Sequence, residues 1–344
     1  MSMFVLGIET SCDETSAAVV QDGRTVVSSV VASQSDLHAR WGGVVPEVAS
    51  RMHVERVLPV VIEALEGASI QPSRVSAVAV TNRPGLIGAL VVGVACAKAL
   101  SYAWRVPLLG VHHVVAHLYA AMLADPGLDF PFVCLVVSGG HTELILAEGH
   151  GMWSVVGRTR DDAAGECLDK SARLLGLPYP GGPAVEELAL AGDPRAVALP
   201  RAWLDGALDF SFSGLKTAVA RAVKRAQPGF RLEDMAASLQ AAVVDVLVAK
   251  TVAAARLAGV GRVALGGGVA ANGALAAGME AACKAAHLTC SVPPRDLCTD
   301  NAAMVAAAAF PRLAVGQDDG LGLDTVATEY LPLWGRGEIG LERA

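Results

Sequence analysis

The sequence predicts an α/β protein, and three observations support this class. Apolar, β-prone runs alternate with longer segments of helical periodicity, as in layered folds of strands and helices. A strand, a polar turn and a second strand occur at 4–20 and recur at 132–147, which predicts a duplicated architecture. The 344 residues include 36 glycines and only 5% aromatic residues, a composition that fits an α/β enzyme better than a β-sandwich.

The expected elements follow in order along the chain. In the first half, strands at 4–9 and 17–20 flank the polar turn 10–16, and helices at 48–66 and 86–104 alternate with strands at 75–80 and 107–111. In the second half, the strands of 132–147 are followed by helices at 163–176, 214–226 and 233–258. A strand, a glycine loop and a helix are then expected over 263–275. The last expected element is an Ala-rich helix that starts near Thr299.

Composition narrows the function classes. At about 150 residues per domain, the length predicts two domains, and 53% hydrophobic with 18% charged residues excludes a disordered chain. The net charge of −7 argues against a free-standing nucleic-acid binder, which usually carries a basic excess. The seven cysteines form no Cys-x-x-Cys pair and the N-terminus lacks a secretory signal, so we expect a soluble, cytoplasmic protein with reduced thiols. The apolar stretch 86–104 is expected to be a core helix, with no membrane contact.

Two histidines are the first candidate site. The motif VHHVVAH places His113 and His117 four residues apart, so their imidazoles share one face of a helix. Such a pair is half of a metal site, although two ordinary helix-surface histidines give the same pattern. A His-Glu-x-x-His peptidase would need a glutamate where Val114 stands. Asp300, in PPRDLCTDN, can supply a third ligand and leave positions on the ion open.

Polar and glycine-rich turns are the second group of candidates. Asp13 and Glu14 follow the first strand, where carboxylates can hold a metal-bound phosphate or move a proton; a solvated turn is the alternative. SGGHTE (138–143) and LGGGVAAN (265–272) follow apolar strands, and their glycines let backbone amides approach a phosphate. Asn272 stands where the next helix begins. A tight structural turn explains each loop equally, and neither has the dinucleotide spacing G-x-G-x-x-G.

Acidic residues mark the helix expected at 163–176. Asp162, Glu166 and Asp169 share one face of it, and the turn Pro-Gly-Gly-Pro then places Glu186 one turn into the next helix. A salt-bridged exposed face is the usual explanation for such spacing.

One dense basic stretch stands out in this acidic chain. FSFSGLKTAVARAVKRA carries Lys216, Arg221, Lys224 and Arg225 on a helix that Ser213 can cap. The stretch is either a solvated helix face or a surface on which an RNA backbone lies.

Nine motifs in unbroken order resemble the universal tRNA threonylcarbamoyltransferase family in its bacterial TsaD form, formerly called O-sialoglycoprotein endopeptidase. They are GIETSCDETS, GGVVPEVASRMH, VHHVVAH, VSGGHTEL, DDAAGECLDK, YPGGPAVE, FSFSGLKTA, GGGVAAN and CTDNAAM. The resemblance covers about residues 4 to 310. It implies an actin/Hsp70/sugar-kinase-like fold: two ribonuclease-H-like domains, 1–127 plus 300–344 and 128–299, with a central nucleotide cleft.

The resemblance also implies site residues. A divalent metal, iron or zinc, would be held by His113, His117 and Asp300. The substrate threonylcarbamoyl-AMP, or ATP, ADP or AMP in the same site, would contact Val136, Val137, Ser138, Gly139, Gly140, Asp169, Gly182, Glu186, Gly267 and Asn272. Independently of the resemblance, we expect Asp13 or Glu14 to take the amine proton and the basic stretch to contact tRNA.

The implied reaction is transfer of threonylcarbamoyl to the exocyclic amine of adenosine 37 in tRNAs that read ANN codons, with release of AMP. The implied partners are tRNA, a TsaB-like paralogous subunit and a TsaE-like small ATPase. Arg83 departs from the family's usual Thr-x-Gly-Pro-Gly-Leu and puts the local loop geometry in question, because arginine adopts a positive φ less readily than glycine. A metallopeptidase, a sugar kinase or chaperone of the same fold, and a non-catalytic scaffold remain as alternative functions.

Overall fold

The computed structural model describes residues 2–204, 207–225 and 229–334, which form two compact units. The first contains 2–127 and Asp296–Tyr330, and the second contains Leu128–Arg295 and 331–334. The division expected from the sequence assigns 300–344 to the first unit. Within that segment, Val155 of the second unit donates a hydrogen bond to Pro332 O (2.8 Å) and accepts one from Trp334 N (3.0 Å). Residues 335–344 lie outside the described chain.

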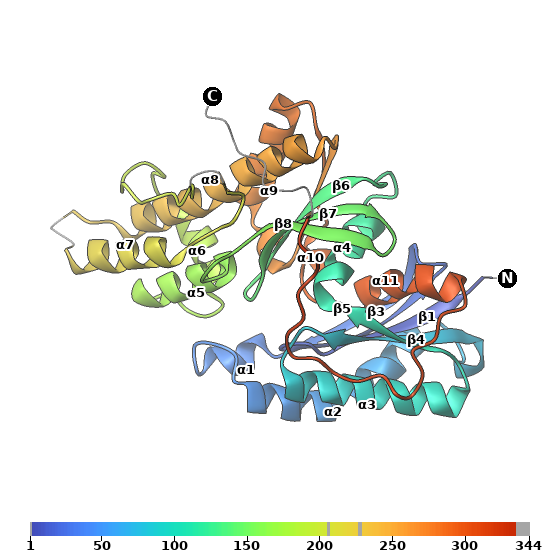
Figure 1. Ribbon diagram of the computed structural model, residues 1–344. Helices are drawn as coiled ribbons and strands as arrows, with labels where there is room; N and C mark the ends of the chain where they lie inside the picture. The colour runs from blue at the N-terminus through green and yellow to red at the C-terminus, as the bar shows by residue number, and fades with distance from the viewer. Residues whose placement is uncertain (1, 205–206, 226–228, 335–344) are drawn as a thin grey trace. The chain divides into compact units, whose positions relative to one another are not determined.

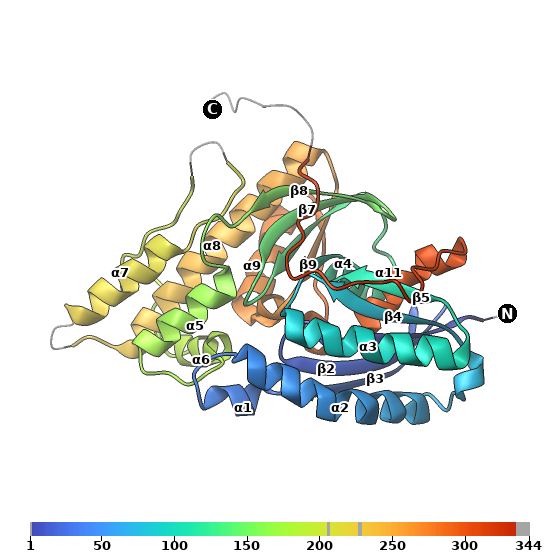
Figure 2. The same cartoon turned by 60° about the horizontal axis from the view of Figure 1, so that its bottom comes forward.

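A five-stranded sheet forms the centre of the first unit (Figures 1 and 2). Its strands lie in the order β3 (Thr25–Ser33), β2 (Glu14–Gln21), β1 (Phe4–Glu9), β4 (Val75–Arg83) and β5 (Leu108–His112). The first three strands are antiparallel neighbours, whereas β4 runs parallel to β1 and β5 parallel to β4. β1 and β4 are apolar and almost fully buried, as expected for central strands covered on both faces.

Helices cover both faces of this sheet. α2 (Pro46–Gly67) and α3 (Ile87–Trp104) pack against each other and against β2, β3 and β4, and this layer contains an apolar core. α4 (His113–Ala124) and α11 (Ala302–Ala314) pack on each other, and α11 lies along the other side of the sheet (Figure 1). α11 therefore brings residues 302–314 against β1 and β2, near the beginning of the chain. The short elements are α1 (Ser35–Ala39), η1 (Pro72–Arg74) and α10 (Arg295–Cys298).

The second unit repeats this strand order. Its sheet is β10 (Thr289–Ser291), β9 (Arg262–Gly266), β6 (Phe132–Val137), β7 (Thr142–Gly149) and β8 (Met152–Arg158). As in the first unit, three strands form an antiparallel meander and two are added in parallel. The expectation of a duplicated architecture is thereby confirmed. Its helices are α5 (Ala164–Leu174), α6 (Gly181–Ala189), α7 (Ser213–Lys224), α8 (Leu232–Ala258), η2 (Gly268–Ala271) and α9 (Gly273–Ala285).

The third strand of each meander, β3 and β8, is not expected from the sequence. Both are edge strands, and their side chains are mostly exposed or half-buried. Because little of each strand is buried, the apolar signal is weak. The β3 segment TVVSSVVAS, for example, interrupts its valines with serines.

α3 is long and apolar enough to cross a membrane by length and composition alone, and 39% of that segment is buried within the protein. It packs against α2 and β4 as one layer of the first unit. The buried part agrees with the core helix that the sequence predicts for 86–104.

Arg83 ends β4 without a positive φ, so the strain considered for this position does not arise. Its guanidinium forms an ion pair with Glu329 in the C-terminal tail. The tail follows the edge of the sheet, where Leu108 N donates to Asp318 Oδ1 (2.9 Å) and Gly110 N to Asp319 Oδ2 (2.8 Å). The unpaired edge of β5 is covered in this way.

Candidate active site

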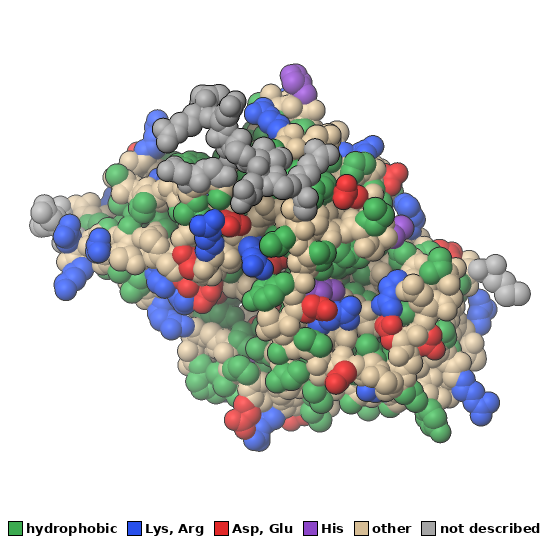
Figure 3. Space-filling view, in the orientation of Figure 1, with side chains coloured by type: hydrophobic (Ala, Val, Ile, Leu, Met, Phe, Trp, Pro, Cys, Tyr) green, Lys and Arg blue, Asp and Glu red, His purple; other side chains and the backbone are tan. Residues whose placement is uncertain are grey.

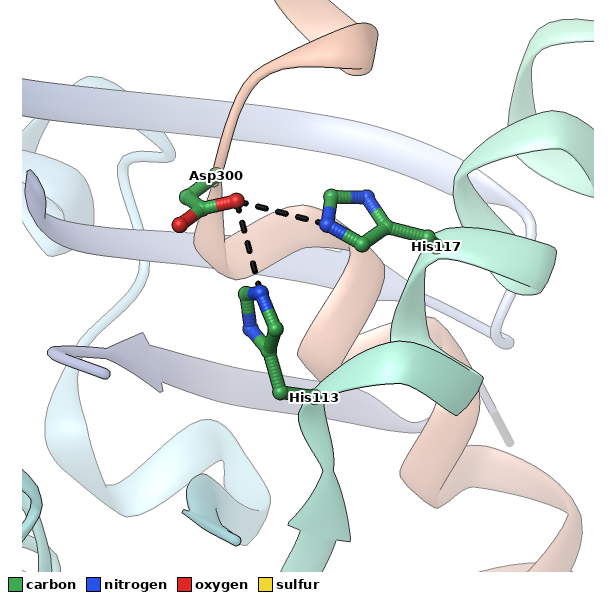
Figure 4. Close-up of side chains that lie close together, drawn as sticks. All are labelled: His113, His117 and Asp300. Atoms are coloured by element: carbon green, nitrogen blue, oxygen red, sulfur yellow. Dashed lines mark ion pairs between the residues drawn. The ribbon is translucent and has the colours of Figure 1, made fainter. Parts of the chain in front are cut away.

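His113, His117 and Asp300 converge in the first unit (Figure 4). Asp300 Oδ1 lies 3.3 Å from His117 Nε2 and 3.5 Å from His113 Nε2. The two histidines are buried, and the Asp300 side chain is 18% exposed. Among the described residues, this is the one group of three or more metal-type side chains with ligand atoms within 4.8 Å of one another.

The fold places these three side chains through two junctions. β5 passes directly into α4, so His113 is the first residue of the helix and His117 follows one turn later on the same face. Asp300 precedes α11, whose first turn is capped by the Asn301 side chain accepting from Met304 N (3.0 Å). Gly7 on β1 has no side chain, which allows the backbone of α11 to rest directly on the sheet: a Cβ there would lie 2.1 Å from Ala302 O.

The arrangement fits a small divalent cation. Two ligands of a tetrahedral ion with bonds of about 2.0–2.2 Å lie about 3.3–3.6 Å apart, which matches the separations from Asp300 to the two imidazoles. Nδ1 of His117 is buried without a hydrogen-bond partner among the described residues, and a buried polar atom without a partner is costly. Nε2 makes no hydrogen bond either, and its contact is the ion pair with Asp300. Two imidazoles and one carboxylate are also a donor set suited to iron or zinc, with positions left for a ligand.

Charge around the histidines is uneven. Burial alone would lower the pKa of His113, but the carboxylates of Asp300 and Glu9 outweigh it and raise this pKa to about 9. The preceding residue behaves in the opposite way, because burial and then the nearby Arg83 lower the pKa of His112 to about 4. The environment of His113, on the face of α4 toward Asp300, therefore favours positive charge, whereas the environment of His112 does not.

Asp13 ends the turn that follows β1, and Glu14 is the first residue of β2. Glu14 lies close enough to Asp300 for that carboxylate to affect its pKa. Burial, followed by the neighbouring Asp13 and Asp300 carboxylates, raises the pKa of Glu14 well above its ordinary value. The Ser33 hydroxyl donates to Glu14 Oε1 (3.2 Å). An ionised carboxylate with a raised pKa is a stronger base. Asp13 and Glu14 therefore stay candidates for moving a proton.

The two glycine loops of the second unit lie against each other and against α5. Gly165 N donates to Ser138 O (3.1 Å), and a Cβ on Gly267 would lie only 2.4 Å from Val137 O. Gly139, Gly140, Gly182 and Gly268 instead face open space, with nothing within 4 Å of the position of a Cβ. Exposed backbone of this kind is what a phosphate or a flat ring can approach. The side chains of Val136 and Val137 are fully buried, so only their main chain is available to a ligand.

The polar residues that the sequence predicts near the two glycine loops form hydrogen bonds that connect neighbouring loops and helix ends. Asp169 Oδ1 accepts from Gly181 N (2.7 Å) and Gly182 N (3.3 Å). Glu186 Oε1 accepts from Gly273 N (2.7 Å) at the start of α9. Asn272 caps α9 by accepting from Leu275 N (3.0 Å), as its position predicts, and it donates to Gln240 Oε1 (2.9 Å).

The basic helix α7 differs in detail from the expectation. Arg221, Lys224 and Arg225 lie at the surface, and basic side chains gather over α7 at the left of Figure 3. Lys216, in contrast, donates its Nζ to Asp162 Oδ2 (2.8 Å). The other oxygen of this carboxylate, Oδ1, accepts from Lys170 Nζ (2.9 Å). Asp162 precedes α5, and is not on its face.

The expected Ser213 cap of α7 is wrong. The residue at the cap position is Phe212, and its backbone N–H and that of Ser213 donate to Asp161 Oδ1 at 2.8 and 3.2 Å. A carboxylate from a distant loop serves the start of this helix, which the local sequence could not reveal.

Comparisons with known proteins cover most of the chain. A model of the family described as tRNA N6-adenosine threonylcarbamoyltransferase (TsaD) matches residues 25–307. A relative of that name from Symbiobacterium thermophilum is 55% identical over 324 residues, which are 94% of this chain and 95% of the relative.

Solved structures are similar at low sequence identity. HypF from T. kodakarensis has a TM-score of 0.63 at 17% identity, covering 91% of this chain and 48% of that chain. A ROK family glucokinase from Streptomyces griseus has a TM-score of 0.50 at 14% identity, covering 89% and 98%. Likeness at this identity concerns the fold alone, and it confirms the expected actin/Hsp70/sugar-kinase-like class.

Proposed function

The chain belongs to the tRNA N6-adenosine threonylcarbamoyltransferase family, and from this membership we propose how its residues carry out the reaction. It is a transferase that modifies tRNA by joining a threonylcarbamoyl group to the N6 amine of an adenosine. We propose that the donor is threonylcarbamoyl-AMP and the acceptor is adenosine 37 of tRNAs that read ANN codons. The amine forms a bond to the carbamoyl carbon, the bond from that carbon to the phosphate oxygen breaks, and AMP leaves.

The convergence of His113, His117 and Asp300 supports the proposed metal site more than any other observation. The separations from Asp300 to the two imidazoles match those of ligands on one tetrahedral ion. Nδ1 of His117 has no hydrogen-bond partner in the described chain. The ion, iron or zinc, would supply positive charge for the phosphate or the threonyl carboxylate of the donor.

The second unit offers a surface suited to the adenylate. Gly139, Gly140 and Gly182 face open space, so a ligand can approach their backbone closely. We assign Ser138 and Gly267, in the same two loops, to this surface as well. Asp169, Glu186 and Asn272 hold these loops in register through the bonds described above. ATP, ADP or AMP would fit the same surface, because the shared feature is the adenine nucleotide. A nucleotide between the two units stays a prediction.

We assign removal of the amine proton to the Asp13 and Glu14 pair, with the proton moving from N6 to a carboxylate oxygen. The pKa of Glu14 is raised by burial and by the neighbouring carboxylates. A raised pKa makes the ionised Glu14 carboxylate a stronger proton acceptor.

A TsaB-like paralogous subunit and a TsaE-like ATPase are proposed as partners beside tRNA, in the cytoplasm. Exposed apolar side chains on α2 and α3 support a protein partner (Figure 3, lower surface). Val54, Leu58 and Ile62 recur every four residues along α2, and each is more than half exposed. Ile87 and Val91 on α3 are each 50% exposed. Apolar stripes of this extent usually mark protein interfaces.

The decisive experiment measures nucleosides of tRNA by mass spectrometry after incubation of the chain with threonylcarbamoyl-AMP and candidate partners. Wild type is expected to yield threonylcarbamoyladenosine. His113→Ala should lower the yield by more than about 100-fold, since loss of an outer-shell partner alone costs about 10–100-fold at a metal site. The control is His287→Asn, a surface histidine with a left-handed backbone that asparagine also accepts.

Full activity of His113→Ala with no bound metal would refute the metal assignment. Phosphorylation of a sugar, or ATP turnover without tRNA, would favour the kinase or chaperone alternative. Cleavage of a glycoprotein that depends on His113 would favour the peptidase, and a chain inactive in every assay would favour the scaffold.

A further inference from the structure

A buried glutamate lies directly behind the candidate metal site. Glu9 is the last residue of β1, has no exposed surface, and its Oε2 lies 3.2 Å from His113 Nδ1. We propose that Glu9 is a positioning residue that fixes the ring of His113 with Nδ1–H toward the carboxylate and Nε2 toward the ion. This inference rests on the proposed function, because it assumes the metal site.

The two nitrogens of His113 have different surroundings. Nδ1 lies 3.2 Å from both Glu9 Oε2 and Ser11 Oγ, whereas Nε2 lies 3.5 Å from Asp300 Oδ1. A carboxylate only accepts hydrogen bonds, so it selects the tautomer that carries the proton on Nδ1. That tautomer places the lone pair on Nε2, the nitrogen that faces Asp300 and on which a metal would bind. His117 has no such partner on its Nδ1 in the described chain, so Glu9 acts on only one of the two ligands.

Glu9 is itself held rigidly. Ser11 N donates to Glu9 Oε1 (2.6 Å), and Thr81 Oγ1 donates to Glu9 Oε2 (2.5 Å). Ser11 lies in the turn that follows β1, and Thr81 lies on β4, the neighbouring strand in the middle of the sheet. In the described chain, His113 is the only basic side chain that forms an ion pair with Glu9. A buried carboxylate is unfavourable unless such partners surround it, and here every donor orients it toward the ring.

Replacing Glu9 by glutamine conflicts with this set of donors. The carboxylate accepts from Ser11 on one oxygen and from Thr81 and His113 on the other, whereas an amide has only one oxygen. If the amide oxygen faces Ser11, the NH2 group meets His113 Nδ1 and favours the proton on Nε2, where the metal should bind. If the oxygen faces His113, the NH2 group opposes the Ser11 N–H.

The test measures Zn²⁺ affinity of the full-length chain by competition with a chelator. Glu9→Gln should weaken binding about 10–100-fold, the usual effect of losing an outer-shell partner. The matched control is Glu63→Gln, an exposed glutamate on α2, which should bind as wild type does. Affinity of Glu9→Gln within twofold of wild type overturns the proposal.

A second measurement does not depend on the variant folding. In Zn²⁺-loaded wild type, nitrogen NMR of the His113 ring should show the metal on Nε2 and a proton on Nδ1, and metal on Nδ1 overturns the proposal. His113→Ala separates the two levels of inference. If wild type binds Zn²⁺ no better than His113→Ala, the metal site itself fails and Glu9 with it. If Glu9→Gln binds Zn²⁺ as tightly as wild type while His113→Ala does not, the metal site is supported and the proposed role of Glu9 is wrong.

Discussion

At the scale of single residues, the surroundings of a histidine determine its pKa and its suitability as a metal ligand. His112 and His113 are adjacent in sequence, yet their pKa values shift in opposite directions. His113 faces two carboxylates, whereas His112 is buried near Arg83 and its ring is 3.4 Å from the carbonyl oxygen of Glu329. Composition does not distinguish them, but their contacts make only His113 suited to a cation.

The lowered pKa of His112 predicts a pH-dependent stability. Its pKa is about 4 in the folded protein against 6.5 for an ordinary histidine. Between these values the unfolded chain binds more protons, so the free energy of unfolding falls as pH drops from 6.5 toward 4 and is unaffected by this group above 6.5. The loss is at most about 3.5 kcal/mol, at about 1.4 kcal/mol per pKa unit.

Denaturant unfolding of the metal-free protein at several pH values checks this prediction. His112→Gln should lose less stability than wild type between about pH 7 and about pH 4, while His287→Asn should follow wild type. Equal slopes for wild type and His112→Gln would contradict the shift.

Sequence spacing identifies some residues of the site and misses others. The spacing of His113 and His117 on a helix is enough to indicate half a metal site, because a period of 3.6 residues fixes their common face. The approach of Asp300 could not be derived from spacing, since it depends on α11 returning across the sheet. Glu9 was not singled out at all, although a charge that ends an otherwise apolar strand was a usable signal.

At the scale of elements, the packing of α11 on β1 controls the site. Gly7 allows the backbone of α11 to lie on the strand, and the Ser16 hydroxyl accepts from Ala302 N (2.9 Å) at the start of that helix. Asp300 is two residues before Ala302. The height of α11 above the sheet therefore sets the distance between Asp300 and the two imidazoles.

Gly7→Ala tests this packing. The new methyl group would meet Ala302 O at 2.1 Å and Ala306 N at 3.0 Å, and both are backbone atoms that can yield only if α11 moves. We expect a loss of at least about 1–3 kcal/mol in the free energy of unfolding, as for overpacked cores, together with weaker Zn²⁺ binding.

Gly214→Ala is the matched control for this change. Gly214 lies in α7 with open space around its Cβ position, so alanine should stabilise the helix by about 0.5–1 kcal/mol. Wild-type stability and Zn²⁺ affinity in Gly7→Ala would show that α11 is not held at this height by the glycine.

Element boundaries expected from the sequence agree best where the pattern is long. The expected helix 86–104 corresponds to α3 at Ile87–Trp104, and the strand 75–80 begins β4. β3 and β8 escape prediction because edge strands bury little. The start of α7 is misjudged because the carboxylate that serves it is Asp161, 52 residues before Ser213 in sequence. Long-range interactions of this kind leave no local pattern.

At the scale of the whole molecule, the net negative charge of the protein repels its negatively charged RNA substrate. A chain of charge −7 meets an RNA whose backbone is also negative, so local positive surface has to supply the attraction. Arg221, Lys224 and Arg225, on and directly after α7, lie at the surface, and we propose them for this role. Lys216 is already paired with Asp162. Partner subunits are expected to add the remaining phosphate-binding groups.

The double variant Lys224→Ala and Arg225→Ala tests this surface. In complexes with the partner subunits, the slope of log affinity for tRNA against log salt should become shallower by about 1 for each phosphate that the variant no longer neutralises. Lys284→Ala, an exposed lysine on α9, should leave the slope unchanged. A slope that is the same in the double variant and wild type removes α7 from the tRNA surface.

The duplicated architecture is predictable at this scale, because each half repeats an apolar strand pair around a polar turn. The matching strand order of the two sheets follows from that repeat and from the parallel strands added beside it. The path of the C-terminal tail is not predictable, since its hydrogen bonds to Asn82, Leu108 and Gly110 come from a segment without regular structure.

The late position of Asp300 has a consequence for biosynthesis. The ribosome releases His113 and His117 with the first third of the chain, and at about 5–20 residues per second roughly 10–40 s pass before Asp300 is made. If the three side chains bind a metal as proposed, a nascent chain has only the two imidazoles until Asp300 is added. Termination before Asp300 would give a product without this carboxylate, so we expect tight metal binding only in chains translated past that residue.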